Sequence, residues 1–270
     1  MKHIIKTAEA ATLDPIQMLW VRGDFSRLEL LSLRSFLAQG HPLHLYSYDP
    51  PKNLPKGIDV LEASKIVDEK LAPITNSKPF GKGGMGSFSD YFRYQLLYQK
   101  GGWWSDLDVV ALKPWINFPN TLTASTNEKG YGKIANGFVM RFPTGHPVMR
   151  DCISALDQKK LTEIGIDETG PLLLHKVLGP DGVKEFSQNE TVFAPIPWNA
   201  SWQALRTWKE RISINEIKQR MRRPHLSMRF SGDTVAAHLW NETWRAAGLD
   251  KNKIFPSSCL YEKWQKEYNT

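Results

Sequence analysis

The sequence has few of the features that mark secreted or membrane-spanning proteins. Its 270 residues contain only two cysteines, Cys152 and Cys259, which argues against a disulfide framework. No apolar run is long enough to span a bilayer, and residues 1–17 lack the continuous apolar stretch of a secretory signal. Internal repeats and low-complexity tracts are also missing. These absences predict a cytoplasmic globular protein.

The composition is that of a chain with a sizeable core, with 41% hydrophobic and 23% charged residues. The formal net charge is +7, which suits an anionic partner such as nucleic acid, a membrane surface or a phosphorylated substrate. Charge alone does not choose among these partners. The ten tryptophans can fill a core or stack on bases and sugars.

The first part of the chain alternates strand and helix patterns. Residues 16–21 (IQMLWV) predict a buried strand, Ser26 and Glu29 form a capping box that begins a helix, and residues 43–48 predict the next strand. A strand–helix–strand unit implies a parallel pair of strands, and therefore an α/β sheet.

Shorter apolar patterns predict the later elements. We expect strands at residues 58–61, 121–126, 134–141 and 191–196, and helices at residues 63–67, 147–156, 171–177 and 212–221.

The most informative stretch is residues 87–114, SFSDYFRYQLLYQKGGWWSDLDVVALKP. Ser87 and Asp90 form a weaker variant of the capping box, which predicts that a helix begins there. A Gly-Gly pair ends that helix. A β-rich strand is then expected at residues 103–110.

Two carboxylates, Asp106 and Asp108, interrupt this expected strand. Residues two apart on a strand point to the same side, and two carboxylates on one face require a balancing cation. A hard divalent metal would supply it. An Asp-x-Asp pair is weak evidence by itself, because aspartate usage of roughly 5% gives about one such pair by chance in a chain of this length. Solvent-facing carboxylates on an edge strand are the alternative.

Several chemistries fit the carboxylate pair. The run Asp106-Leu-Asp108-Val-Val fits the Asp-x-Asp-x-Val pattern of haloacid-dehalogenase phosphohydrolases, in which the first aspartate attacks phosphorus with Mg²⁺ assistance. That motif normally follows four apolar residues near the chain start, which is not the case here. A nucleotide-sugar site is the other metal-dependent hypothesis, with Asp90 and Arg93 on one helical face to orient the donor. An exposed helix ion pair is the simpler explanation of those two residues.

Two further hypotheses have less support. Gly81-x-Gly83-x-x-Gly86 matches the glycine fingerprint of dinucleotide-binding sites, but no strand precedes it, so a loop over residues 77–86 is favoured. A basic nucleic-acid-binding protein is the non-enzyme alternative. The sequence contains no recognised nucleic-acid-binding motif, so we expect no nucleic-acid partner.

The stretch SDYFRYQLLYQKGGWWSDLDVV resembles the signature Ser-Asp-x-x-Arg-x-x-x-Leu-x-x-x-Gly-Gly-x-Tyr-x-Asp-x-Asp of a glycosyltransferase family. This family includes lactosylceramide galactosyltransferases, yeast initiating mannosyltransferases, bacterial capsule and lipopolysaccharide sugar transferases and, more distantly, the clostridial glucosylating toxins. Asp90, Arg93, the Gly-Gly pair, Asp106 and Asp108 match in order. Trp104 stands where the signature has tyrosine.

Other segments resemble the same family in the expected order. LWVRG (residues 19–23) is similar to the first-strand segment that holds the nucleotide base, and NGFVMRFPTGHP (residues 136–147) to the segment near the transferred sugar. Residues 168–171 resemble a Thr-Gly-Pro turn of the family, and residues 238–241 resemble its C-terminal His-x-Trp segment.

The resemblance implies a GT-A fold, in which a Rossmann-like nucleotide-binding half and an acceptor-binding half share one mixed sheet. We expect a single domain over residues 1–270, with halves at about 12–115 and 116–270. The implied activity is retaining transfer of a hexose from a UDP- or GDP-sugar, dependent on Mn²⁺ or Mg²⁺, to a glycan or lipid-linked acceptor. Bacterial surface polysaccharide synthesis is the expected setting.

The resemblance also implies residue roles, without naming a general base. The metal ligands would be Asp106, Asp108 and His238. The catalytic residues would be Asp106, Asp108, Arg93 and Asn136. The donor-binding residues would be Leu19, Trp20, Val21, Asp90, Arg93, Trp104, Asp106, Asn136 and Trp240.

Two patterns lie outside the motif. The pairs Trp198/Trp202 and Trp240/Trp244 have helical spacing and are most typical of core residues. The basic segment 206–229 could contact anionic lipid on the inner face of the membrane, or it could be a solvated helix face.

Overall fold

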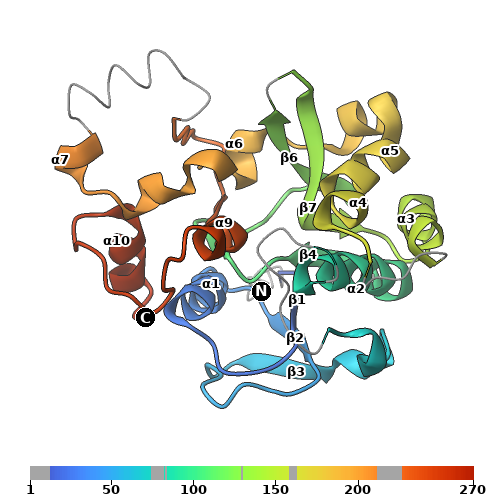
Figure 1. The fold of residues 1–270 in the computed structure, drawn as a ribbon, viewed down its shortest axis with the longest axis horizontal. Helices are drawn as coiled ribbons and strands as arrows, with labels where there is room; N and C mark the ends of the chain where they lie inside the picture. Colours follow the sequence, from blue (N-terminus) through green and yellow to red (C-terminus); the bar gives the residue numbers. More distant parts are fainter. Residues whose placement is uncertain (1–12, 74–81, 83, 129, 158–162, 212–226) are drawn as a thin grey trace, which may run out of the picture.

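A six-stranded mixed sheet forms the centre of the computed structural model, which describes residues 13–73, 82, 84–128, 130–157, 163–211 and 227–270 (Figure 1). The strands are β1 Ile16–Trp20, β2 Leu43–Ser47, β3 Ile58–Glu62, β4 Gly102–Ser105, β6 Leu122–Glu128 and β7 Gly132–Phe142. They lie in the order β3-β2-β1-β4-β7-β6. The first four strands of this order are parallel, whereas β7 and β6 are antiparallel to their neighbours. The expected parallel α/β unit is therefore confirmed.

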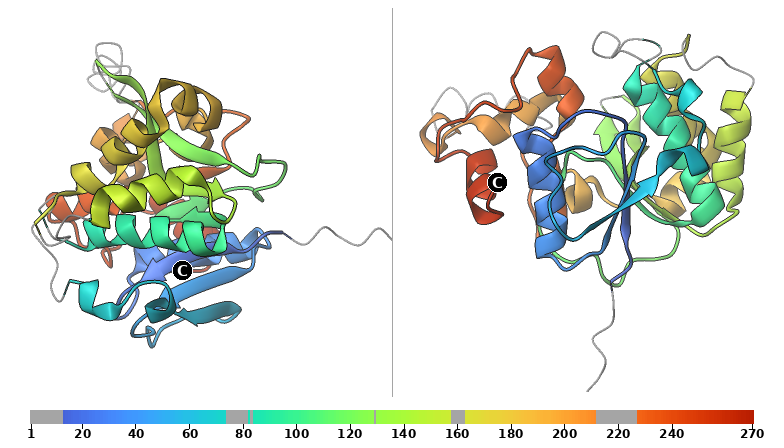
Figure 2. Two further views of the ribbon diagram at one scale, coloured as in Figure 1. Left: turned by 90° about the vertical axis from the view of Figure 1, so that its right-hand side faces the viewer. Right: turned by 90° about the horizontal axis from the view of Figure 1, so that it is seen from below.

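Helices cover both faces of this sheet. The α-helices are α1 Arg27–Ala38, α2 Met85–Lys100, α3 Pro147–Asp157, α4 Ile166–Thr169, α5 Pro171–Phe186, α6 Glu190–Phe193, α7 Trp208–Arg211, α9 Asn241–Ala246 and α10 Leu260–Glu267. Short 3₁₀ segments lie at Ala63–Lys65 and Glu69–Leu71, and a longer one, η3, at Trp198–Leu205. Figures 1 and 2 show α2, α3 and α5 on one side of the molecule, and α1 with the C-terminal helices on the other.

The two faces of the sheet build separate parts of the core. Adjacent residues of β4 point to opposite faces, as the pleat requires. Trp104 packs with Phe92 of α2, whereas Trp103 packs in the cluster that contains Phe36 of α1. Both indoles are about 1% exposed. This short strand is thus held by large aromatic side chains on both faces, which fixes the position where it ends.

A second, two-stranded sheet joins distant parts of the chain. β5 Val109–Ala111 pairs antiparallel with β8 Ala236–His238, and Val109 lies opposite His238. The hydroxyl of Ser32 in α1 donates to the carbonyl of Val109, and the hydroxyl of Ser35 accepts from the amide of Ala111. These contacts hold the segment after β4 against α1 and bring the C-terminal part of the chain beside it.

Of the two capping boxes predicted from the sequence for α1 and α2, one is confirmed and one is wrong. Ser26 and Glu29 form the predicted capping box at the start of α1. The predicted box of Ser87 and Asp90 is wrong, because α2 already begins at Met85. The Ser87 hydroxyl donates to the carbonyl of Ile164, and Asp90 is buried among other partners.

Two other expectations fail or lie outside the described residues. The strand predicted at 191–196 is wrong, since this segment contains the short helix α6, whose Val192 and Phe193 pack into the core. Tertiary packing overrides the β preference of a short Thr-Val-Phe run. The helix predicted at 212–221 and most of the loop predicted at 77–86 lie outside the described residues.

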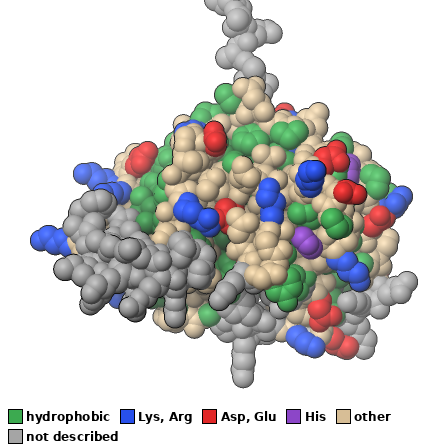
Figure 3. Space-filling view, turned by 90° about the horizontal axis from the view of Figure 1, so that it is seen from above, with side chains coloured by type: hydrophobic (Ala, Val, Ile, Leu, Met, Phe, Trp, Pro, Cys, Tyr) green, Lys and Arg blue, Asp and Glu red, His purple; other side chains and the backbone are tan. Residues whose placement is uncertain are grey.

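The surface seen from above in Figure 3 carries Lys and Arg side chains spread among acidic and uncharged groups. On the visible part of this face the basic groups do not gather into one patch. Among the helices that the structure describes, none has the length and apolar character needed to cross a bilayer.

The end of α2 gives a stability prediction. Gly101 has φ +66°, and a Cβ there would lie 2.6 Å from the amide nitrogen of Thr144. Gly145 has a similar φ of +73°, but a Cβ added there would meet nothing within 4 Å. Gly145→Ala should cost about 1–2 kcal/mol for the left-handed conformation alone. Gly101→Ala should cost about 1–3 kcal/mol more from overpacking.

Urea unfolding of the two alanine variants checks this difference. Equal losses of unfolding free energy in Gly101→Ala and Gly145→Ala would contradict the steric account of the α2 terminus.

Candidate metal centre and donor site

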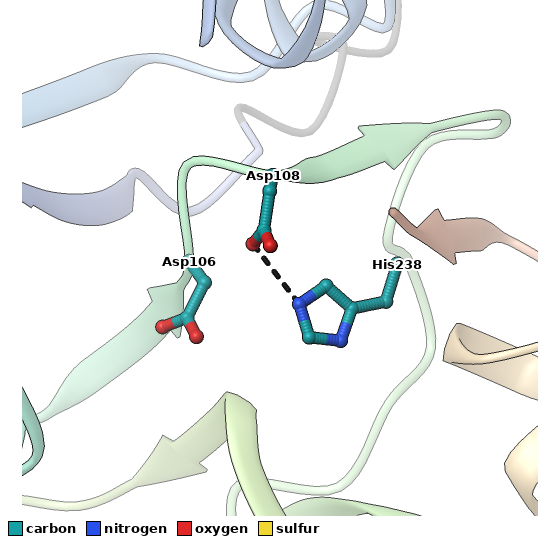
Figure 4. Close-up of side chains that lie close together, drawn as sticks. All are labelled: Asp106, Asp108 and His238. Atoms are coloured by element: carbon teal, nitrogen blue, oxygen red, sulfur yellow. Dashed lines mark hydrogen bonds and ion pairs between the residues drawn. The ribbon is translucent and has the colours of Figure 1, made fainter. Parts of the chain in front are cut away.

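Asp106 and Asp108 lie in the turn that connects β4 to β5. The expected continuous strand over residues 103–110 is therefore wrong, because β4 ends at Ser105. The amide of Asp106 donates to the carbonyl of Phe138, and the amide of Val109 donates to the carbonyl of Asp106. Both carboxylates nevertheless face the same space, as Figure 4 shows. The turn thus places both carboxylates on the same side, which the sequence analysis had expected of a strand.

His238 completes this cluster from the far end of the chain. The antiparallel pairing of β5 and β8 places it beside Asp108, and its Nε2 lies 3.0 Å from Asp108 Oδ1 (Figure 4). Ligand atoms of Asp106, Asp108 and His238 all lie within 4.8 Å of one another. Within the described part of the chain, this is the one group of three or more such side chains that could hold a metal ion.

Aromatic side chains fix the plane of the His238 ring. Phe138 stacks on it with ring centroids 4.2 Å apart, and the Trp240 ring lies 3.9 Å away. Trp240 is itself held, because its indole N–H donates to the carbonyl of Ile196. The imidazole therefore has little freedom to turn away from the two carboxylates.

The donor atoms around this space fit a divalent cation. Two carboxylates and one imidazole form an oxygen–oxygen–nitrogen set suited to Mn²⁺, and the carboxylates also suit Mg²⁺. The amide of Asn241 donates to Asp108 Oδ2 at 2.7 Å. Among the described side chains, Asn241 Oδ1 and His238 Nδ1 are buried polar atoms for which the structure records no hydrogen-bond partner.

The two aspartates differ in their electrostatic surroundings. Burial raises the pKa of Asp106 above its ordinary value, and Arg93 opposes this shift only in part. Burial acts in the same direction on Asp108, but the attraction of His238 and the hydrogen bonds from His238 and Asn241 bring its pKa below the ordinary value. Asp108 is thus the more readily ionised member of the pair. A cation between them would favour the charged form of both.

A buried ion-pair chain lies behind Asp106. Arg93 Nη2 is 3.1 Å from Asp106 Oδ1, and Arg93 Nη1 is 3.2 Å from Asp90 Oδ1. The guanidinium also lies over the ring of Trp104, at 5.2 Å from its centroid. Asp90 is 3% exposed and Arg93 is 6% exposed. The exposed helix ion pair considered from the sequence is therefore wrong, and both residues belong to the interior next to the candidate metal ligands.

An irregularity in β7 makes room for this arrangement. Thr123 of β6 pairs with Met140, but the next residue, Ala124, pairs with Asn136, so residues 137–139 form a bulge. Phe138 in the bulge reaches the His238 ring, and a Cβ at Gly137 would lie 2.9 Å from Arg93 Nη1. Bulges are frequent next to active sites because they redirect side chains. Phe138 and Gly137 were not predicted as site residues, although the Asn-Gly pair in the strand was a usable signal of irregular backbone.

The remaining predicted donor residues lie in different surroundings. Trp104 is in the core, where its indole N–H donates to Asp106 Oδ1 at 2.8 Å. Trp20 is partly exposed, its indole N–H donates to the carbonyl of Gly23, and its ring packs on Phe25. Trp104 therefore supports a candidate metal ligand, and Trp20 keeps an accessible side.

The other expected donor contacts are distributed around the same strands. Leu19 and Val21 pack into the core cluster on the α2 side of the sheet. Asn136 is half-buried in β7, next to the bulge. Trp240 contacts His238 directly.

The predicted core position is confirmed for one of the four paired tryptophans, and Trp240 is half-buried. Trp244 is fully buried, as expected. Trp198 and Trp202 in η3 are 40% and 39% exposed, so the core prediction for this pair is wrong. The segment is a 3₁₀ helix with a kink at Ala200, in which residues four apart do not form a common buried face.

A comparison with protein families identifies this region. Residues 73–128 match the family model described as the glycosyltransferase sugar-binding region containing DXD motif. The chain carries the DXD region of this glycosyltransferase family. The match covers α2, β4 and the turn with both aspartates, and it decides between the transferase and phosphohydrolase hypotheses in favour of a glycosyltransferase.

One solved glycosyltransferase structure aligns with a TM-score above 0.5 and shows the fold, and two others align more weakly. The apo-form glycosyltransferase GlyE of Streptococcus pneumoniae TIGR4 aligns with a TM-score of 0.51 and 12% identity, over 96% of this chain and 61% of that chain. The PaToxG glycosyltransferase aligns with a TM-score of 0.40 and 11% identity, over 94% and 84%. The WbbM bifunctional glycosyltransferase, in its apo structure, aligns with a TM-score of 0.40 and 7% identity, over 95% and 52%.

The predicted GT-A fold is thus confirmed. This chain spans only 61% of the GlyE chain and 52% of the WbbM chain. Among curated protein sequences, none matches this glycosyltransferase.

The buried ion pair gives a pH prediction. Burial raises the pKa of Asp90 from 3.8 to about 6, although Arg93 and Thr169 oppose the shift. Because the folded-state pKa is the higher one, the stability that protonated Asp90 contributes is complete below about pH 4 and is lost as the pH rises through 6. Asparagine does not titrate. The melting temperature of Asp90→Asn, relative to that of the unchanged protein, should therefore rise between pH 4.5 and pH 7.5.

Thermal unfolding of both proteins in a chelator-containing buffer series measures this difference. A difference in melting temperature that stays constant, or that falls, across the series would show that Asp90 is not protonated in this way.

Proposed function

We propose that this glycosyltransferase transfers a hexose from a UDP- or GDP-sugar with retention of anomeric configuration and depends on Mn²⁺ or Mg²⁺. The observation that carries the proposal is the convergence of Asp106, Asp108 and His238 within 4.8 Å, inside a region that matches a DXD glycosyltransferase family. Two conditions thus meet in one place: a donor set for a hard cation, and a sequence region associated with sugar transfer.

The residues of the site have different roles in metal binding. Asp108 is the more direct metal ligand in this proposal, Asp106 is shared between the metal and the ribose of the donor, and His238 is a third protein contact. When bound, the cation neutralises the diphosphate and stabilises it as a leaving group. Trp104 and Arg93 hold the Asp106 carboxylate from behind through its Oδ1.

The nucleotide and the sugar lie on the open side of this cluster in the proposal. Trp20, with Leu19 and Val21 at the end of β1, flanks the nucleotide, while Asn136 and Trp240 face the transferred sugar. We name no protein nucleophile and no general base. In retaining transfer of this kind, the acceptor hydroxyl attacks on the face from which the diphosphate leaves, and a phosphate oxygen takes the proton.

The halves of the molecule have different tasks in this proposal. Residues of about 12–115 bind the nucleotide-sugar, and residues of about 116–270 bind the acceptor and close the metal site, all within one domain. Support comes from the central sheet, in which β1 to β4 of the first half are continuous with β7 and β6 of the second.

We further propose a glycan or lipid-linked acceptor and a role in bacterial surface polysaccharide synthesis, with the enzyme in the cytoplasm. The basic segment 206–229 would contact anionic lipid at the inner face of the membrane. Residues 212–226 of this segment lie outside the described residues, so the support for this contact is the sequence alone.

Nucleotide binding should depend on metal. We expect one nucleoside diphosphate, UDP or GDP, to raise the melting temperature in the presence of Mn²⁺ and to have little effect with chelator. A ligand at 100 times its dissociation constant stabilises the native state by about 2.7 kcal/mol. Thermal shift with UDP, GDP, CDP and their sugars, with and without Mn²⁺, measures this. No shift with any of them at high concentration would contradict the proposed donor site.

A further prediction concerns the proposed metal ligand Asp108. Asp108→Asn keeps an acceptor for the Asn241 amide but removes the charge, so we expect sugar transfer to fall more than about 100-fold while the melting temperature stays within a few degrees. Asp108→Ala should likewise abolish turnover in a folded protein. Asp151→Asn, at an exposed aspartate of α3, is the matched control and should retain activity. An active Asp108→Asn or Asp108→Ala enzyme would remove the basis for the assignment.

A further inference from the structure

Thr169, at the end of α4, is a buried side chain that reaches the donor-side helix α2. It is 0% exposed, and its hydroxyl donates to Asp90 Oδ2 at 2.8 Å. The hydroxyl of Tyr94, also in α2, donates to the carbonyl of Thr169 at 2.9 Å. The Thr169 hydroxyl also lies 3.4 Å from the carbonyl of Gly165. Asp90 and Tyr94, which bond Thr169 from α2, lie one turn apart on that helix and hold both its backbone and its side chain.

Asp90 is held on both of its oxygens by protein groups. Oδ2 accepts from Thr169, and Oδ1 pairs with Arg93 Nη1 at 3.2 Å. With 3% of its surface exposed, Asp90 does not present its carboxylate to a ligand in this structure. The charged side chain that Asp90 contacts here is Arg93.

Arg93 transmits this constraint to Asp106. The guanidinium lies between the two carboxylates, with the Trp104 ring on one side and the Gly137 backbone close by. Ser89 also holds the guanidinium, since its carbonyl accepts from Nε at 3.3 Å and its hydroxyl accepts from Nη2 at 3.2 Å. Asp90 acts together with Ser89, by holding Nη1 while Nη2 points toward Asp106 Oδ1. A continuous series of contacts therefore runs from Thr169 through Asp90 and Arg93 to a candidate metal ligand.

We propose that Thr169 is a positioning residue, whose hydroxyl orients Asp90 and, through Arg93, sets the orientation of Asp106 for cation binding. This inference rests on the proposed metal-dependent function. It assigns Asp90 and Arg93 a supporting action on the metal ligand, and it links the acceptor half, which contains Thr169, to the donor half. Groups that orient ligands from outside the coordination shell typically change metal affinity by 10- to 100-fold when lost.

Three variants at matched buried threonines test the metal-binding part. Thr169→Val keeps the shape but removes the donor, Thr169→Ser restores the hydroxyl, and Thr123→Val removes a hydroxyl that is equally buried but bonds Ser187. Titration with Mn²⁺ alone, by calorimetry, should give about 10-fold weaker binding for Thr169→Val. Thr169→Ser and Thr123→Val should bind within about twofold of the unchanged protein.

A merely structural role predicts a different pattern. If Thr169→Val binds Mn²⁺ as the unchanged protein does, or if Thr123→Val weakens binding equally, the proposal is overturned. In the Asp90→Ala background, Thr169→Val should have no further effect on Mn²⁺ affinity, since the side chain that links Thr169 to Arg93 is absent. If Thr169→Val weakens Mn²⁺ binding in that background as much as it does in the otherwise unchanged protein, the proposal is likewise overturned.

A metal-free double-mutant cycle separates this inference from the proposed function. Thr169 and Arg93 are joined through Asp90 in the series above, so Thr169→Val and Arg93→Lys should be coupled in urea unfolding by at least about twofold in the unfolding equilibrium constant. Additive effects would overturn the inference even if the protein binds Mn²⁺. If the unchanged protein binds no divalent cation, the proposed function fails, while the unfolding cycle still decides whether Thr169 acts on Arg93.

Discussion

Two carboxylates that share one partly buried space repel each other, and the structure around Asp106 and Asp108 is arranged to offset that cost. Asp106 is paired with Arg93 and accepts from Trp104, while Asp108 is paired with His238 and accepts from the Asn241 amide. Each aspartate therefore has its own side-chain and donating partners. Both carboxylates remain directed at the common space, where a cation would be the remaining counter-charge.

The partners come from distant parts of the chain, and specific pairings bring them together. The β5–β8 ladder places His238 opposite Val109, the bulge in β7 places Phe138 under the imidazole, and the junction of α4 and α5 places Thr169 against Asp90. None of these contacts is local in sequence. The site thus depends on the completed sheet and on its helical layers, and a change that moves β7 or β8 should affect the charge balance at the turn.

Much of this arrangement could be predicted from the sequence, because its signals are local. The capping box at Ser26, the Gly-Gly stop of α2 and the strand–helix–strand pattern of the first half follow from short-range backbone preferences. The sequence also predicted that the two aspartates share one side, although it placed them in a strand and not in the turn that holds them. The contribution of His238 was expected only through the family resemblance, since 130 residues separate it from Asp108.

The features that sequence reasoning missed depend on tertiary packing. A break in the strand before Asp106 is not visible in a β-rich run such as WWSDLDVV, because the break is set by the bond from Asp106 to Phe138 in the β7 bulge. Burial of Asp90 and Arg93 depends on the Thr169 segment, so a surface ion pair was the simpler expectation from the sequence.

The most direct test of the central claim is a crystal structure of the protein with Mn²⁺ and a nucleoside diphosphate, using the anomalous signal of manganese. The account predicts one strong anomalous peak between the Asp106 and Asp108 carboxylates and His238, with the diphosphate beside it. A manganese peak elsewhere, or a bound nucleotide remote from this turn, would contradict it.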